Sequence, residues 1–197
     1  QVNPMLPFNA PDRVRALVGE DAFGRLARAS LGSADALFAL IERYQIRCEA
    51  RQRGWLRVLH SAAAERKAAE DIRAWNAIGG EMEMIGPDET RRLSGSPRYK
   101  AGVVTARGGA IHPYKLVCGI ADVARQAGAR LFSHAPVTRL EQDGAHWRAH
   151  TPGGTVRSRQ VIVATNGYTD RLVPGLAESI VPLTPIQIAT DPLPKDV

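Results

Sequence analysis

The sequence predicts a mixed α/β fold that carries an antiparallel β-meander. In the first half, apolar residues recur at three- and four-residue spacing from Val14 to Tyr44, which indicates amphipathic helices. In the second half, short segments of alternating polarity are joined by Gly153-Gly154, a pair typical of a hairpin turn. The run at 160–164, Gln-Val-Ile-Val-Ala, predicts a strand that is covered on both faces.

Length and composition place the chain among globular proteins. Its 197 residues are enough for a hydrophobic core. The 44% hydrophobic and 23% charged residues exclude a disordered tail, a collagen-like fibre and a disulfide-dense scaffold. No stretch is apolar over the length needed to cross a bilayer. The chain starts at Gln1 and ends in a proline-punctuated segment, so we expect an internal fragment of a larger protein.

The net charge and the cysteines do not identify a binding partner. The net charge is +6, with 26 basic and 20 acidic residues. Arginine strongly outnumbers lysine, as is common in proteins from GC-rich genomes, so the charge alone predicts no nucleic-acid partner. Cys48 and Cys118 are far apart and form no CxxC pair, which suits a reducing, cytoplasmic location.

The first half is predicted to be mainly helical. A proline-punctuated start gives way near Asp12, a candidate N-cap region, to a helical stretch that Gly32 and Ser33 interrupt. A later helix stops at Gly79-Gly80, as a helix end does. The predicted elements after the first helical stretch are a strand at 55–59, a helix at 62–78, a strand at 83–85 and a helix that begins at Pro87.

The second half is predicted to combine short strands with one long helix. This helix begins at Pro113 and ends at Gly128. Its predicted apolar face is formed by Leu116, Val117, Ile120, Val123, Ala124 and Ala127. The predicted strands lie at 100–105, 130–133, 137–141, 145–150, 155–157 and 160–164.

Common catalytic and metal-binding motifs are missing from the sequence. There is no GxGxxG, GxxxxGK[ST], HExxH or GxSxG pattern. His146 and His150 are four residues apart, but they fall in a predicted strand and turn, where they would not share a helix face. We therefore predict no metal site, and no nucleophile is visibly paired with a base.

Two segments stand out as candidate ligand sites. One is Gly109–Pro113, which leads directly into the long helix. The other is the run at 161–168, where a predicted buried strand ends in the small-residue turn Ala-Thr-Asn-Gly. Such a turn brings backbone N–H groups to the sheet edge where open α/β sheets bind ligands, and small residues allow close approach to a phosphate. A turn that only reverses the chain remains an equal alternative.

A series of short motifs follows in a fixed order along the second half of the chain. They are Gly109-x-x-x-Pro113, the helix, Gly128-Ala129, Val137-Thr138-x-Leu140, the meander with Thr-Pro-Gly-Gly, Val161-Ile-Val-Ala-Thr-Asn-Gly-Tyr-Thr169, Ile180-Val-Pro and Gln187-x-Ala-Thr-Asp-Pro-Leu193. This order resembles that of the FAD-dependent oxidoreductases of the D-amino-acid-oxidase (DAO) type, and the last motifs are similar to those of the gamma-glutamylputrescine oxidase branch. The resemblance covers most of the chain and is strongest over residues 100–193.

The resemblance implies a fragment of a FAD/NAD(P)-binding, Rossmann-like flavoprotein with a helical insert, lacking the N-terminal GxGxxG unit. It divides the chain into a mainly helical segment at 1–99, a FAD-contacting segment at 100–179 and the start of a substrate-domain segment at 180–197. The implied activity is oxidation of an amine or amino-acid C–N bond by hydride transfer to flavin. Because the phosphate loop of the family precedes the position of Gln1, we expect this chain alone to bind FAD weakly or not at all and to be inactive.

The resemblance also implies particular cofactor contacts. Val137 would meet the adenine through its backbone, although from the residues alone an ordinary core valine is the simpler interpretation. The loop Gln1, Val2 and Asn3 would lie near the flavin ring. The turn formed by Ala164, Thr165, Asn166 and Gly167 would lie over the dinucleotide, and Gln187 would enter the substrate domain. No catalytic residue follows from the resemblance.

Two other functions stay open at this point. The basic stretch Arg43, Arg47, Arg51, Arg53, Arg57 contains three arginines at four-residue spacing, which would line one helix face toward nucleic-acid phosphates. Sparse aromatic residues and the lack of a recognition motif favour instead a solvated face that pairs with Glu42 and Glu49. The other alternative is a non-catalytic domain that kept the fold and lost its site.

Overall fold

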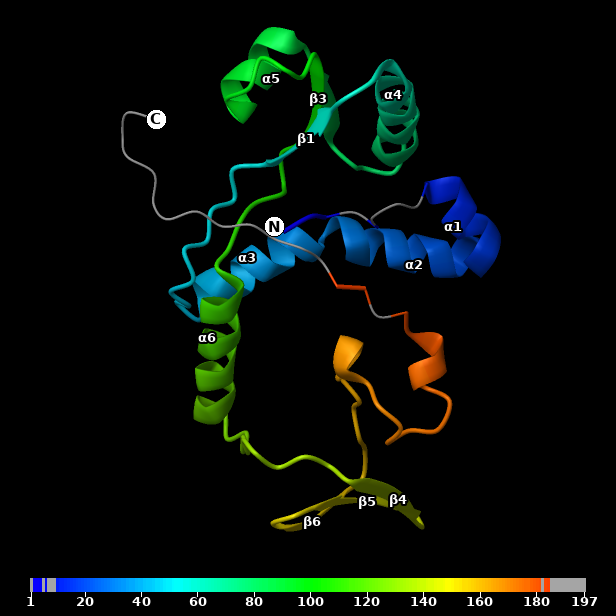
Figure 1. Ribbon diagram of the computed structural model, residues 1–197, viewed down its shortest axis with the longest axis vertical. Helices are drawn as coiled ribbons and strands as arrows, with labels where there is room; N and C mark the ends of the chain where they lie inside the picture. The colour runs from blue at the N-terminus through cyan, green and yellow to red at the C-terminus, as the bar shows by residue number, and fades with distance from the viewer. Residues whose placement is uncertain (1, 5, 7–9, 182, 185–197) are drawn as a thin grey trace. The chain divides into compact units, whose positions relative to one another are not determined.

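The computed structural model describes residues 2–4, 6, 10–181 and 183–184 (Figure 1). Its contacts divide the chain into two compact units, Gln1–Arg130 and Leu131–Val197. Helices and one small sheet form the first unit, and a second small sheet dominates the other. The mixed α/β class predicted from the sequence is confirmed.

The first unit combines an antiparallel three-stranded sheet, in the order β1-β3-β2, with six helices in its described part. The strands are β1 (Trp55–Leu59), β2 (Met82–Ile85) and β3 (Ala101–Thr105). The helices are α1 (Pro11–Val18), α2 (Glu20–Leu31), α3 (Ser33–Arg43), α4 (Ala62–Asn76), α5 (Pro87–Ser94) and α6 (Pro113–Gln126).

Local sequence signals explain most of these boundaries. Prolines occupy the first turn of α1, α5 and α6, where a missing N–H costs no hydrogen bond. The hydroxyl of Ser61 caps α4 by accepting from the N–H of Ala64. The predicted N-cap role of Asp12 is wrong: the N-cap position is Ala10, and Asp12 lies in the first turn, where it pairs with Arg15.

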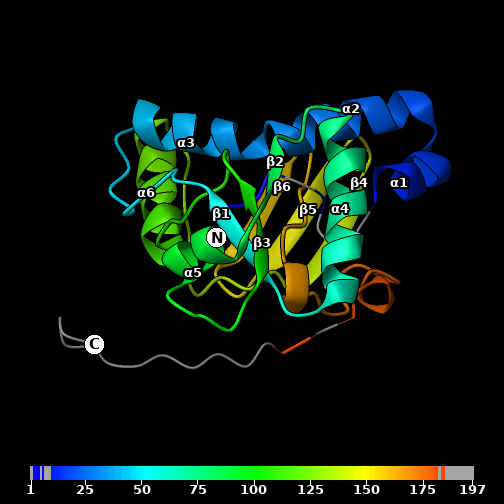
Figure 2. The same cartoon turned by 90° about the horizontal axis from the view of Figure 1, so that it is seen from above.

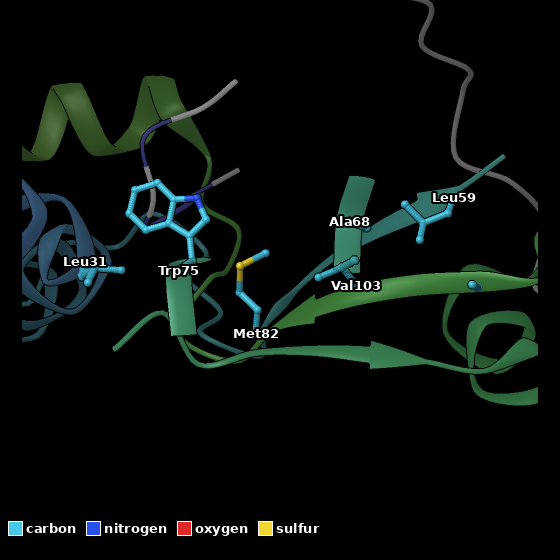
Figure 3. Close-up of a cluster of buried hydrophobic side chains, with 7 residues drawn as sticks. Leu31, Leu59, Ala68, Trp75, Met82 and Val103 are labelled. Atoms are coloured by element: carbon cyan, nitrogen blue, oxygen red, sulfur yellow. The ribbon is translucent and has the colours of Figure 1, made fainter. Parts of the chain in front are cut away.

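The main hydrophobic core lies between α4 and one face of the first sheet (Figures 2 and 3). The sheet register places Met82 opposite Thr105 on this face, which also carries Val103. Trp75 of α4 packs into the same cluster and is 4% exposed, while Val103 is fully buried. The other face of the sheet receives α5, whose Thr90 hydroxyl lies beside Gly102 of β3.

A second cluster anchors α6 within the first unit. Leu116 packs with Ile41, Ile46 and Cys48, and Val123 lies against that cluster. The rest of the predicted apolar face of α6 is not buried within the unit. Val117 is 64% exposed and Ile120 is 41% exposed, because the helix turns only its Leu116 edge toward α3 and the loop after it.

The second unit contains the predicted meander. Strands β4 (Arg139–Asp143), β5 (His146–Thr151) and β6 (Gly154–Ser158) form an antiparallel sheet in sequence order. The predicted hairpin is confirmed, with Thr151 opposite Gly154. Two short 3-10 helices follow, η1 (Asn166–Tyr168) and η2 (Ala177–Ser179).

Two predicted strands of the second half are wrong. Residues 130–133 and 160–164 form no strand. Ile162 is 90% exposed, so the run at 160–164 is not covered on both faces as predicted. A strand requires a hydrogen-bonded neighbour, and among the described residues no segment pairs with this run. Its apolar composition alone could not supply that partner.

The structure also corrects the basic helix face. Helix α3 ends at Arg43, and the chain then passes through a turn around Gln45 before the bridge at Arg51. Arg47 and Arg51 therefore lie outside any helix and cannot share a helix face with Arg43. The four-residue spacing of the arginines continues beyond Arg43, but helix α3 ends there, so the spacing does not place them on one helix face.

Candidate functional site

One candidate ligand-binding segment is a corner of the first unit, where the N-terminal segment meets the chain after β3. Val2 and Gly109 exchange both backbone hydrogen bonds, at 2.8 and 3.0 Å. On the other side, Arg51 and Ala110 exchange two more, at 2.9 and 3.0 Å. The predicted ligand segment that starts at Gly109 is thus held between two partners that are distant from it in sequence.

Gly108 and Gly109 permit this close approach. A Cβ on Gly109 would clash with the carbonyl oxygen of Arg51 and would lie 2.6 Å from Cζ of Phe38. A Cβ on Gly108 would lie 2.7 Å from Cβ of Trp55 and 3.2 Å from the carbonyl oxygen of Val2. Only glycine fits at both positions without displacing backbone.

Two polar atoms at this corner lack a hydrogen-bond partner within the described part of the chain. One is Oδ1 of Asn3, the residue that the resemblance places near the flavin ring. The other is Oγ1 of Thr105, at the end of β3, whose side chain is fully buried. Sequence reasoning missed Thr105, since a threonine at a strand end is common and only the fold shows that it is enclosed.

A second candidate segment, in the second unit, lies at the start of the meander. Thr138 joins the sheet by donating its N–H to the carbonyl of His150 at 2.8 Å. Neither backbone polar group of Val137, the residue before it, has a partner among the described residues. The Val137 side chain is 38% exposed, which makes it a poor core residue. The residue is therefore free to meet a ligand through its backbone.

The turn at 164–167 is a third candidate segment, also in the second unit. It is exposed throughout, and Asn166 adopts a left-handed conformation with φ of 47°. The N–H groups of Tyr168 and Thr169 close the turn on the carbonyls of Thr165 and Asn166, at 3.0 and 3.1 Å. Nothing lies within 4 Å of the position that a Cβ on Gly167 would take, so a ligand can approach the backbone there.

The predicted cofactor residues thus fall in both units. Val2 and Asn3 belong to the first, and Val137 and the 164–167 turn to the second. Gln1 and Gln187 lie outside the described residues. The backbone of Val2 is fully used by Gly109, so Asn3 is the described member of the N-terminal loop with polar atoms left for a ligand.

Ion pairs shift the titration of two glutamates. Nε2 of His150 lies 2.9 Å from Oε2 of Glu141, and this hydrogen bond, helped by the charge of Arg139, lowers the pKa of Glu141. The hydrogen bond and charge of Lys115 likewise lower the pKa of Glu49. Glu49 is exposed and Glu141 is half-buried, and each is held in an ion pair that accounts for its lowered pKa, so neither is a candidate catalytic acid.

One open cavity of about 390 Å³ lies between the residues after α3 and helix α6. Arg47, Lys115 and the exposed free thiol of Cys118 are among its lining residues. Lys115 is already paired with Glu49, and the lining side chains show no nucleophile–base pair. In the described residues, no group of His, Cys, Asp and Glu could hold a metal ion.

The sequence of this chain matches a known family. The family model of FAD-dependent oxidoreductases (DAO) matches residues 7–197, and the chain belongs to this family. The probable oxidoreductase OrdL of Haemophilus influenzae is 27% identical over 190 residues, covering 91% of this chain and 43% of that protein. Human mitochondrial dimethylglycine dehydrogenase is 33% identical over 118 residues, covering 57% of this chain and 13% of that protein.

A solved structure supports the same fold. Glycine oxidase from Geobacillus kaustophilus superimposes with a TM-score of 0.67 at 19% identity, over 74% of this chain and 41% of that one. The chain therefore spans less than half the length of each of these three proteins. Within the described residues, no helix combines the length and the apolar character that a membrane span requires.

Taken one at a time, the candidate segments carry groups that suit FAD, the cofactor of this family. The unpartnered N–H of Val137 can donate a hydrogen bond to an adenine edge, and its carbonyl can accept one from it. The open backbone at Gly167 leaves room for a pyrophosphate or ribose. The buried, unpartnered Oδ1 of Asn3 is an acceptor for a polar edge such as that of a flavin ring.

Proposed function

We propose that this chain is part of a FAD-dependent oxidoreductase that oxidises a C–N bond of an amine or amino acid. FAD, when bound, supplies the hydride acceptor for that oxidation. The class of reaction follows from membership of the family, and the similarity to dimethylglycine dehydrogenase favours an amine substrate. The gamma-glutamylputrescine oxidase branch remains our candidate for the particular amine.

The observation that carries the cofactor assignment is the free backbone of Val137. At the edge of a sheet, a residue whose backbone N–H and carbonyl have no partner can form hydrogen bonds to a ligand. In this proposal Val137 holds the adenine, and Ala164, Thr165, Asn166 and Gly167 cover the dinucleotide. Gln1, Val2 and Asn3 approach the flavin ring, and Gln187 contacts the substrate.

In this proposal, the residues of this chain bind the cofactor and orient it. The pairing of Val2 with Gly109 fixes the N-terminal loop, and the turn at 164–167 offers its exposed backbone to the cofactor. We also propose the division into segments 1–99, 100–179 and 180–197. The two free cysteines, Cys48 and Cys118, favour a cytoplasmic location.

The test uses the full-length protein that contains this segment. We expect it to purify with a flavin absorption band, and anaerobic addition of a substrate amine to bleach that band. Val137→Pro removes the N–H proposed to bind adenine and should weaken FAD binding by up to about tenfold. Val137→Ala keeps the N–H and should bind FAD normally. Full-length protein that binds no flavin would refute the proposal.

A further inference from the structure

The turn that leads from β3 to Gly109 carries a half-buried arginine, Arg107. Its guanidinium meets both carboxylate oxygens of Glu81: Nη2 lies 2.6 Å from Oε1, and Nε lies 3.1 Å from Oε2. Nε also lies 3.6 Å from Oδ2 of Asp35, in the first turn of α3. Since Glu81 directly precedes β2, Arg107 joins the end of β3 to the start of β2 and to α3.

A glutamine completes this network from a fourth segment. Nε2 of Gln52 donates to Oδ1 of Asp35 at 2.7 Å and to the carbonyl oxygen of Arg107 at 3.1 Å. The residue before it, Arg51, exchanges two backbone hydrogen bonds with Ala110. Side chains and backbone together therefore hold the turn after β3 against the loop before β1. We call this network the Arg107 clamp; its members are Asp35, Gln52, Glu81 and Arg107.

The backbone of Glu81 shows that the clamp has a defined geometry. Its φ is 50°, in the left-handed region that residues other than glycine rarely adopt. Such a conformation persists where surrounding contacts compensate for its cost. The two bonds from Arg107 to the Glu81 carboxylate are contacts of this kind. A bidentate, charge-assisted pair within a network also contributes more than an isolated exposed ion pair does.

The clamp restrains the segment on which the N-terminal loop depends. Gly109 exchanges both backbone hydrogen bonds with Val2, as an isolated bridge outside strands β1–β6. An isolated bridge lacks the neighbouring pairs that align a regular ladder, so its position depends on what holds Gly109. Arg107 lies two residues before Gly109, and the carbonyl of Gly108 between them accepts from the N–H of Gly54 at 3.0 Å.

We propose that Arg107 is a positioning residue for the cofactor site. Through its pair with Glu81 it fixes Gly109, and through Gly109 it fixes the loop of Val2 and Asn3 beside the flavin. This inference rests on the proposed function, because it takes Asn3 to line the flavin. The role of Arg107 is exerted through the backbone of the corner and involves no contact with substrate.

Neutralising the pair from either side in the full-length protein tests this role. Arg107→Gln and Glu81→Gln each remove the charge-assisted pair, and each should weaken FAD binding about fivefold. Because both changes break the same pair, the double variant should bind FAD about as weakly as either single variant. The visible absorption band of the bound flavin should shift in all three variants, since the loop beside the ring loses its restraint.

Arg92 provides a matched control in the same unit. Its Nε and Nη2 form the same kind of bidentate pair with Glu89, at 2.7 and 2.6 Å, but both residues belong to α5. Arg92→Gln should leave FAD affinity and the flavin spectrum unchanged. An equal loss of FAD affinity in Arg92→Gln and Arg107→Gln would show a general effect of charge and overturn the inference.

The remaining outcomes are also decisive. If the wild-type full-length protein binds no FAD, the proposed function fails and the inference fails with it. If wild type binds FAD and Arg107→Gln binds it equally well with an unshifted band, the inference alone fails. Additive losses in the double variant would refute the pair with Glu81 as the cause. If Arg107→Gln does not fold, Glu81→Gln decides, and normal FAD affinity in that variant refutes the inference.

Discussion

Gly109→Ala tests the packing of the corner most directly. The added Cβ would clash with the carbonyl oxygen of Arg51 and would lie 2.6 Å from Cζ of Phe38 and 3.1 Å from Cα of Gln52. Two of these three atoms are backbone, so side-chain rotation cannot relieve the overlap. Overpacking of this kind costs about 1–3 kcal/mol.

The clash also forces apart a hydrogen-bonded pair. Arg51 and Ala110 exchange two backbone bonds at 2.9 and 3.0 Å, and each lost bond costs about 1 kcal/mol. We therefore expect Gly109→Ala to lower the free energy of unfolding by about 3–5 kcal/mol. Denaturant unfolding of the intact protein, followed by circular dichroism, measures this loss.

Gly24→Ala is the matched control for this substitution. Gly24 lies inside α2, and the nearest atom to its added Cβ would be Nη1 of Arg28, at 3.6 Å. Alanine is the better helix former, so Gly24→Ala should stabilise by about 0.5–1 kcal/mol. A Gly109→Ala variant within about 1 kcal/mol of wild type would refute the packing argument.

Three further predictions concern individual side chains. Asn76→Ala removes two 2.8 Å bonds to the backbone of Met82 and should cost about 2–3 kcal/mol in denaturant unfolding. Val103→Ala, at a fully buried position, should cost about 2–3 kcal/mol in the same assay. The hydrogen bond from His150 lowers the pKa of Glu141 in the folded protein. The ionised carboxylate therefore stabilises the fold at pH values above the ordinary glutamate pKa, and this stabilisation is lost as the pH falls through the lowered pKa. Glu141→Gln should therefore melt earlier than wild type near neutral pH and match it in acid, in thermal melts across pH.

Each of these predictions has its own control. Gln142→Ala removes one exposed 3.4 Å bond and Val156→Ala truncates a 55% exposed side chain, so each should change stability by about 0.5 kcal/mol or less. Losses in these controls equal to those of Asn76→Ala and Val103→Ala would contradict the burial described here. A melting difference between Glu141→Gln and wild type that does not vary with pH would contradict the role of the ion pair.

Local signals determined many elements from the sequence alone. Pro87 and Pro113 start α5 and α6 as predicted, and the strand at 55–59 is β1 with the same bounds. These signals act within one turn of helix or one hairpin, where a fixed φ or a glycine pair decides the outcome. The family was also recognisable from the order of short motifs, and the family match confirms it.

Candidate contacts were only partly predictable. The sequence singled out Val137 and the 164–167 turn, but not that the backbone of Val137 is unpartnered or that Gly167 is open. It placed Asn3 near a flavin by resemblance, yet gave no sign that Thr105 is buried at the same corner. Those facts depend on which distant segments meet, and a local pattern carries no such information.

The sequence by itself determined the fold class, the starts of α4, α5 and α6, and the family, because these follow from local conformational preferences and from motif order. Tertiary structure alone decided that Val2 pairs with Gly109, that the helix pattern ends at Arg43, and that Ile162 is exposed. The physical reason is that a strand and a buried polar group are defined by their partners. Apolar composition at 160–164 could favour a strand, but only a hydrogen-bonded neighbour makes one.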